Sequence, residues 1–218
     1  ISDTLHTQGI TDLTTLIDAT WTADDLRAAV FTPEAHALNS LNAHFTHFSL
    51  FPNDPDDWVF ANEVTATTAY SGALVFSVGC HSGLNVPDDD ALAPTTALDW
   101  PQAFLRQGAT YIGNTGYGYG DTELIAYSER VMLNFVQELG YWEDAATSPT
   151  VGNALMRAKQ RYYNSAPGGS FSKYDSKALN VMTLYGLPML AVSMPVTATT
   201  PPARAAVNEM RIAHTSAV

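Results

Sequence analysis

The chain has 218 residues, 46% of them apolar, so it is long enough to bury one substantial core. Only 15% of the residues are charged and the formal net charge is −12, which argues against the basic face that nucleic acids and anionic membrane surfaces require. No apolar run reaches the roughly 18 to 20 residues that span a bilayer, and the single cysteine forms no internal disulfide.

Several elements are predicted ahead of the cysteine. Residues 21–30 place Thr22 before acidic residues, a pattern typical of a short capped helix. The apolar segment 38–47 ends in histidines and is predicted to be a strand. The Pro- and Asp-rich residues 51–58 predict a loop, and a helix or turn is expected over 62–70.

The clearest strand signal is the glycine-bounded apolar run 72–83, which contains the only cysteine, Cys80. Its Val and Phe content predicts a fully buried strand that opens into a Gly/Ser loop at the thiol. After a long loop, Asp99 is expected to cap a helix that ends near Gly108. A further strand is expected over 108–113.

Two amphipathic helices are predicted next, over 121–139 with Asp121 as its cap and over 150–163. Residues 189–194 predict a final strand, and the Thr/Pro/Ala-rich residues 195–218 predict a linker or tail. Strands that alternate with helices indicate an α/β fold, with a mostly parallel sheet flanked by helices on both faces.

A thiol and an imidazole are thereby predicted at the ends of two successive strands, because His44 precedes Cys80 by 36 positions, about one strand–crossover–strand unit. Ligands bind at this edge of open α/β sheets. A cysteine and a histidine are the nucleophile and the base of thiol hydrolases, although a lone cysteine on an apolar strand is also a common core residue. His47 is the second candidate base. His81 is not favoured, since consecutive residues of an extended chain point apart.

Histidine first and cysteine second is the order of the caspase, legumain and gingipain clan, and other segments resemble gingipain-like cysteine peptidases. Residues 108–116, GATYIGNTG, look like the strand that follows the cysteine strand in that family. The predicted helices 121–139 and 150–163 look like those that follow it. Residues 174–190, which contain NVMTLYGLP, resemble the close of the same domain. The resemblance covers roughly residues 38–190.

This resemblance implies a caspase-like peptidase domain over 38–194, with 1–37 as the remainder of a longer chain. It implies a polypeptide substrate, catalysis without a cofactor, and a secreted or cell-surface bacterial protein. A missing N-terminal segment or a companion domain of the same precursor is the expected partner. Neither a nucleic acid nor a membrane span is expected.

The resemblance also implies site residues. Cys80 would be the nucleophile and His44 the base, with His47 as the alternative. It implies residues that bind the oxyanion or shape the turn around the thiol: Gly79, Phe45 and Ser82. The family usually has Gly after the catalytic histidine, whereas Phe45 follows His44 here. An inactive domain that keeps the fold for binding or scaffolding is therefore the alternative function.

The glycine-rich loop 113–121 lacks the spacing and the Lys-Ser/Thr of a phosphate-binding loop. In the resembled family this loop walls the pocket for the side chain that precedes the scissile bond. The resemblance therefore gives the substrate-binding candidates as Thr115, Gly116, Tyr117, Tyr119 and Asp121. A carboxylate at Asp121 would select Arg or Lys; the other interpretation is that it only caps the following helix.

Two metal hypotheses complete the predictions. The pair His44-x-x-His47 beside Cys80 suggests a metal-dependent hydrolase, but positions i and i+3 of a strand face opposite sides. The acidic loops 53–57 and 87–90 have the oxygen ligands that calcium prefers, without the spacing of an EF-hand. Gingipain-like enzymes often carry structural calcium, so the resemblance allows it here.

Overall fold

A four-stranded sheet forms the centre of the computed structural model. Its strand order is β1 (Leu38–Ser40), β5 (Leu74–Phe76), β6 (Thr110–Asn114) and β7 (Met182–Tyr185). The first three strands are parallel, and β7 pairs antiparallel with β6. The structure describes residues 1–33, 36–65, 70–86, 98–141, 149–165 and 171–195.

Strand β5 is buried on both faces, as its continuous apolar sequence predicts. Leu74 and Phe76 point into one hydrophobic cluster, while Val75 points into the other. All three side chains are fully buried. The sheet therefore separates two cores, and alternate side chains of one strand contribute to each.

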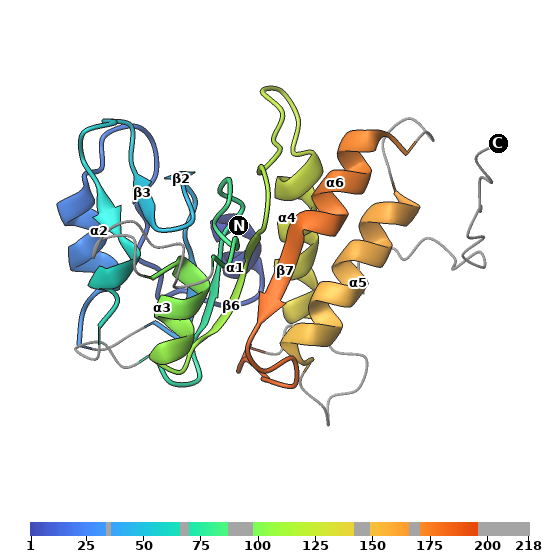
Figure 1. Ribbon diagram of the computed structural model, residues 1–218. Coiled ribbons are helices and arrows are strands. Elements are labelled where there is room, and N and C mark those ends of the chain that lie inside the picture. The colour runs from blue at the N-terminus through green and yellow to red at the C-terminus, as the bar shows by residue number, and fades with distance from the viewer. Residues whose placement is uncertain (34–35, 66–69, 87–97, 142–148, 166–170, 196–218) are drawn as a thin grey trace.

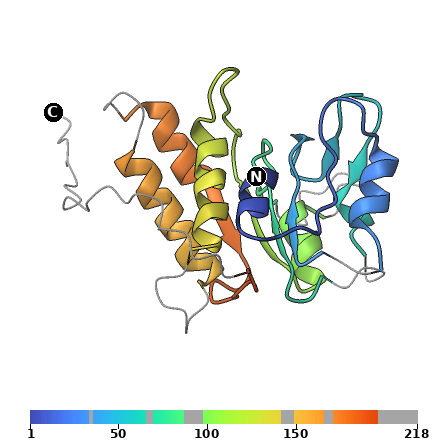
Figure 2. The same ribbon diagram turned by 180° about the vertical axis from the view of Figure 1, so that it is seen from behind.

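Helices α4 (Tyr127–Leu139), α5 (Val151–Asn164) and α6 (Lys173–Val181) cover one face of the sheet (Figure 1). The short helix α1 (Ser2–Thr7) packs against α4 on the same side, as the view from behind shows (Figure 2). Thr150 caps α5 by accepting a hydrogen bond from Asn153 N, which confirms the predicted helix start.

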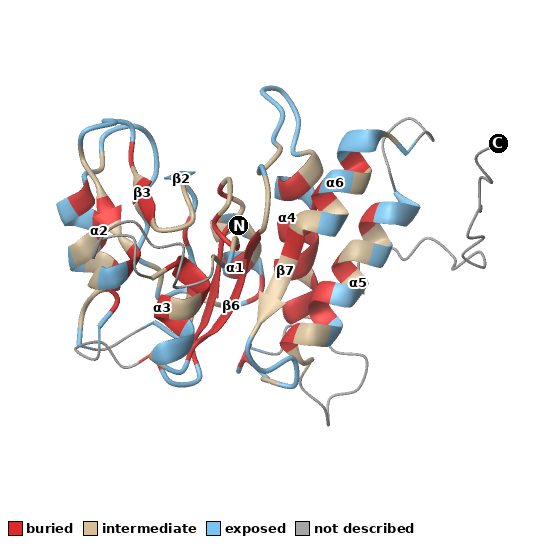
Figure 3. Cartoon of the chain, in the orientation of Figure 1, coloured by how far each residue is buried: buried red, intermediate tan, exposed pale blue. Residues whose placement is uncertain are grey.

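The other face carries α2 (Ala23–Val30), α3 (Trp100–Arg106) and a second, antiparallel sheet. Both helices begin with the predicted caps, Thr22 and Asp99, each in a reciprocal capping box. Buried residues follow the strands and the inner faces of the helices (Figure 3). The expectation of a mostly parallel sheet with helices on both faces is confirmed.

The second sheet was not predicted. It has the strand order β2 (His44–Phe45), β3 (Ser49–Phe51) and β4 (Val59–Phe60), followed by the short helix η1 (Ala61–Glu63). The Pro- and Asp-rich loop joins β3 to β4. Strands of two or three residues are too short to leave a period-2 pattern in the sequence.

Two predicted elements are wrong. Helix α4 begins at Tyr127, not at Asp121, and the intervening Leu124 is 66% exposed. Residues 189–194 form no strand of the sheet, since only an isolated bridge joins Ala191 to Thr150. The sheet closes with β7 instead.

The N-terminal residues pack with the rest of the chain. Leu5 of α1 lies in the cluster with α4, and Leu26 of α2 lies in the cluster with α3. The predicted boundaries at residues 38 and 194 stay predictions, and the predicted tail 195–218 lies, beyond Pro195, outside the described residues. None of the described helices is long and apolar enough to cross a membrane.

Candidate functional site

Cys80 lies in a tight turn just beyond β5, at the edge of the sheet where the parallel strands end. The strand stops at Phe76, so the thiol is not on the strand itself. His81 follows with a φ of +57°, a left-handed conformation that reverses the chain. The side chain of Cys80 is partly exposed. The predicted position at the carboxyl end of a buried strand is therefore correct, and the turn presents the thiol to solvent.

The turn is held by hydrogen bonds to the end of β6. The Ser82 hydroxyl donates to Gly79 O at 2.9 Å and accepts from Asn114 N at 3.2 Å. Gly83 N donates to Asn114 O at 2.8 Å. Ser82 is fully buried by these contacts. It braces the main chain of the turn around the thiol, and its catalytic role stays a prediction.

Gly79, a predicted residue of the turn, and Gly83 are both required by close packing. A Cβ atom on Gly79 would lie 2.3 Å from the ring of Phe45, and one on Gly83 would lie 2.5 Å from the main chain of Gly113. Neither glycine has a positive φ. Their role is thus to let β2 and β6 approach the turn, not to supply an unusual backbone torsion.

The glycine-rich loop after β6 lies against the same turn. Gly118 O is 3.8 Å from Cys80 Sγ, and a Cβ on Gly118 would meet Val78 O at 2.0 Å. His81 N donates to Gly116 O at 2.7 Å. Within the described part of the chain, the N–H of Cys80 itself donates no hydrogen bond. A thiol and an uncommitted main-chain donor therefore come from one residue.

His44 is not at the end of a parallel strand, and this part of the prediction is wrong. The strand β1 stops at Ser40, and His44 lies in β2, where its partner across the ladder is Phe51. Its side chain is exposed and stacks on the Phe51 ring at 5.0 Å between centroids. Phe45 faces the other way, is buried, and packs against Gly79.

His47 follows β2 in the tight turn to β3 and is half-buried. Its main-chain oxygen accepts a hydrogen bond from Trp100 N, at the start of α3. Burial lowers the pKa of His47 below 6.5, the Asp99 carboxylate opposes this shift, and a charge on His81 adds to it. Burial therefore favours the neutral form of His47, which lies within electrostatic range of Asp99 and of His81, the residue next to the thiol.

His81 and Asp99 were not predicted as site residues. Because Cys80 and His81 are in a turn, the expectation that their side chains diverge along an extended chain does not apply. The His81 ring lies 4.8 Å from that of Tyr117, and its Nδ1 is buried without a hydrogen bond to any described residue. Asp99 accepts from Val86 N and Asn85 Nδ2, and burial raises its pKa. Only adjacency to Cys80 could have indicated His81.

Among the described residues, no recorded contact joins the thiol to His44, His47 or His81. His81 is in the turn and His47 is within electrostatic range of it, whereas the exposed His44 ring stacks on Phe51. Catalytic hydrogen bonds are often long or absent in unliganded enzymes, so geometry alone does not reject a candidate base.

The predicted substrate-binding residues share one loop but differ in exposure. Thr115 is tied to α6, since its N and Oγ1 both donate to Val181 O. Tyr117 is 63% exposed. Tyr119 packs edge-on against Tyr174 of α6, with ring centroids 5.5 Å apart. The loop therefore joins the Cys80 turn to α6.

Asp121 does not cap α4, and neither of its hydrogen bonds among the described residues reaches the turn that carries Cys80. Its Oδ1 accepts hydrogen bonds from Glu123 N and Leu124 N, which close a turn within the exposed tip of the loop. The N-cap of α4 is Ala126, five residues after Asp121, so Asp121 is too far from the helix start to cap it. The prediction that Asp121 caps the helix is wrong.

Metal ligands do not gather in the described residues, where no group of three or more His, Cys, Asp or Glu side chains could hold an ion. In the acidic loop 53–57, Asp57 accepts from Ala23 N and Asp54 from Asp56 N. The loop 87–90 lies outside the described residues. Calcium at either loop stays a prediction.

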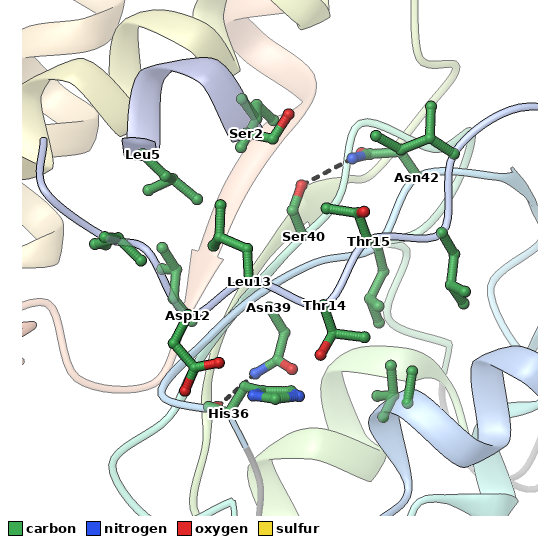
Figure 4. Close-up of a pocket in the computed structure, with 18 of the residues that line it drawn as sticks. Ser2, Leu5, Asp12, Leu13, Thr14, Thr15, His36, Asn39, Ser40 and Asn42 are labelled. Carbon is green, nitrogen blue, oxygen red and sulfur yellow. Dashed lines mark hydrogen bonds between the residues drawn. The ribbon is translucent and has the colours of Figure 1, made fainter. Parts of the chain in front are cut away.

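A cavity of about 860 Å³ lies away from the thiol, between β1 and the N-terminal segment (Figure 4). Leu5 and Leu13 line one side of it and Asn39 and Ser40 the other. Cys80 does not line it.

No protein-family model and no curated protein matches the sequence. Among solved structures, the chain is similar to the complex of Porphyromonas gingivalis RgpB pro- and mature domains, with a TM-score of 0.57 and 17% identity. The match covers 88% of this chain and 42% of that one, so this chain spans less than half of its length. The likeness shows a gingipain-like, caspase-like fold.

Proposed function

We propose that the domain is a cysteine endopeptidase with Cys80 as its nucleophile. The observation that carries the proposal is the placement of Cys80 on a braced turn at the carboxyl end of β5, where the residue is partly exposed and its N–H donates no hydrogen bond to another described residue. This is the edge at which α/β sheets bind ligands. The gingipain-like fold supports the same assignment.

The chemistry follows from these groups. A histidine imidazole takes the proton of the Cys80 thiol. The thiolate attacks the carbonyl carbon, a C–S bond forms as the C=O π bond opens, and the Cys80 N–H binds the resulting oxyanion. The imidazolium then protonates the leaving amine as the C–N bond breaks. Water, deprotonated by the same imidazole, hydrolyses the thioester and frees the thiol. No cofactor is needed.

Two histidines compete for the role of base. The resemblance assigns His44, which is exposed and stacked on Phe51. Partial burial lowers the pKa of the His47 imidazole and so favours its neutral form, which is the form that acts as a base. These properties favour His47. A structure with a substrate bound between the β2–β3 turn and the loop that carries Gly118 would show which of the two imidazoles lies next to the thiol.

The test is the rate of Cys80 alkylation by iodoacetamide between pH 4 and 10, in the wild type and in His44→Ala and His47→Ala. We expect a fast phase that titrates below the free-thiol pKa of about 8.5 and is lost in only one variant. The same variant should lose about 10²-fold or more in peptide hydrolysis, and Cys80→Ala should lose all of it. His6→Ala, in α1, is the matched control.

The second candidate is an inactive domain that binds or scaffolds another protein. The observation that favours it is the absence of a recorded imidazole–thiol contact among the described residues. A slow alkylation with an ordinary pKa in all variants would support this function and reject the peptidase. Secretion or cell-surface display fits both candidates and is part of the proposal.

A further inference from the structure

Two lysines and two tyrosines form an exposed patch where α6 meets the loop that carries Gly118. We call Tyr119, Tyr174, Lys173 and Lys177 the lysine–tyrosine patch. Lys177 Nζ lies 5.8 Å from the ring centroids of both tyrosines, and Lys173 Nζ lies 5.6 Å from that of Tyr174. Both lysines and Tyr174 are exposed. The ring faces thus hold the two ammonium groups near one point of the surface.

The patch continues directly from the thiol. Gly118 O lies 3.8 Å from Cys80 Sγ, and Tyr119 is the next residue. The main chain there is fixed, since Tyr119 N donates to Ser128 Oγ of α4. Thr115 ties the start of the loop to Val181 of α6. A peptide whose carbonyl meets the thiol and whose chain runs along Gly118 toward Tyr119 would reach Lys177, which lies over the Tyr119 ring.

The charge of the patch is unusual for this chain, whose net charge is −12. Neither lysine forms an ion pair with a carboxylate of the described residues. Other cations are committed: Arg27 pairs with Asp24 and Glu63, and Lys159 Nζ donates to Met182 O. The two ammonium groups are available to a ligand.

Two acidic side chains, Asp121 near the tip of the loop and Glu129 at the start of α4, accept hydrogen bonds from the main chain of the loop. Asp121 accepts from Glu123 N and Leu124 N. Glu129 accepts from the main-chain N–H groups of Asp121 and Ala126. Residues 115–120, the part of the loop nearest the thiol, carry no charge of their own, so the charged groups beside this part of the loop are Lys173 and Lys177 of α6.

We propose that the lysine–tyrosine patch binds an acidic side chain of the polypeptide that occupies the Cys80 turn. The Lys177 ammonium donates charge-assisted hydrogen bonds to the carboxylate, with Lys173 adding to the local field. The tyrosine rings pack against the lysine stems and exclude water from one side of the pair. Turnover of such a peptide rests on the proposed function, whereas its binding does not.

Binding to the intact chain carrying Cys80→Ala tests the proposal, since this variant holds a peptide without cleaving it. The probes are three fluorescein-labelled heptapeptide pools with degenerate flanks and a central Glu, Gln or Lys, measured by fluorescence anisotropy. We expect the Glu pool to bind about tenfold more tightly than the Gln pool and the Lys pool to bind most weakly. Added salt should reduce the preference.

Lys177→Gln in the same background should abolish the difference between the Glu and Gln pools, and Lys173→Gln should reduce it by less. The matched control is Arg106→Gln, which removes the same charge from the exposed end of α3 opposite its Asp99 cap. It should leave the preference intact. Equal binding of the Glu and Gln pools, or tighter binding of the Lys pool, would overturn the proposal.

The site of binding and the reaction are then measured separately. A peptide in the Cys80 turn should slow iodoacetamide alkylation of Cys80 in the wild type; binding of the Glu pool without such protection would also overturn the proposal. Wild type that binds the Glu pool with Lys177-dependent preference but hydrolyses no peptide would reject the endopeptidase and keep the acidic site. Wild type that hydrolyses peptides but shows no preference for the Glu pool over the Gln pool would keep the endopeptidase and reject the acidic site.

Discussion

At the scale of single residues, the site is set by how far each imidazole is removed from water. His44 is exposed, whereas His47 is half-buried, and its main-chain oxygen accepts a hydrogen bond from Trp100 at the start of α3. Desolvation disfavours the charged imidazole, so burial lowers the pKa of His47. The sequence places both histidines in one segment, but only the fold gives them different exposure to water.

We expect the NMR titration of the His47 ring to give a pKa below 6.5, the ordinary value for this group. Asp99→Asn should lower this pKa further, because the carboxylate favours the charged ring. His81→Gln should raise it, because a like charge is removed. A titration of His47 at or above 6.5 in the wild type would contradict the burial argument.

The lowered pKa of His47 also determines how the free energy of unfolding changes with pH. Since the folded pKa of His47 lies below the unfolded value, the unfolded chain binds more protons between the two values. The contribution of His47 to stability is therefore complete above about pH 6.5 and is lost as the pH falls through the lowered pKa. His47→Gln should remove this part of the pH dependence of urea unfolding.

At the scale of elements, short helices and strands are held by side chains from distant parts of the chain. The six-residue α1 is too short to be stable alone. It is fixed by Gln8, whose Nε2 donates to Val136 O at 3.0 Å and Gln137 O at 3.3 Å in the last turn of α4. Those carbonyls belong to the group that a helix end leaves unpaired.

We expect Gln8→Ala to destabilise the fold by about 1 kcal/mol, the usual net value of such a hydrogen bond. Hydrogen exchange should accelerate in the last turn of α4 and leave its first turns unchanged. The matched control is Gln160→Ala, on the exposed side of α5. Equal effects of the two substitutions on urea unfolding would show that α1 does not cap α4.

At the scale of the whole molecule, the two hydrophobic clusters share the central sheet. Phe76 packs edge-on against Phe135 of α4, with centroids 5.7 Å apart, while its neighbour Val75 lies in the cluster that contains Trp100. Loss of one cluster uncovers one face of β5 and β6. The clusters should therefore unfold together.

We expect Phe135→Ala to cost about 3 to 5 kcal/mol, since the ring is fully buried. In a Trp142→Phe background, tryptophan fluorescence reports the α3 side and far-UV circular dichroism reports mainly the helices on the α4 side. Both urea transitions should shift by the same amount. Separate transitions would show two independent units, and Met156→Ala, at a 49% exposed position, should shift neither by much.

The sequence by itself determined the elements whose signals are local. The apolar run around Val75, the caps at Thr22 and Asp99, and the glycine-bounded turn at Cys80 are formed by neighbouring residues, so pattern and propensity predict them. The order of strands along the chain likewise indicates the α/β class.

Only the tertiary structure decided which residues surround the thiol. His44 lies in a separate sheet because β1 ends at Ser40, and Lys177 lies over the ring of Tyr119 although 58 positions separate the two in the chain. Such contacts depend on packing between distant elements. The free energy that fixes these contacts comes from covering the two faces of the sheet. A short stretch of sequence therefore cannot predict them.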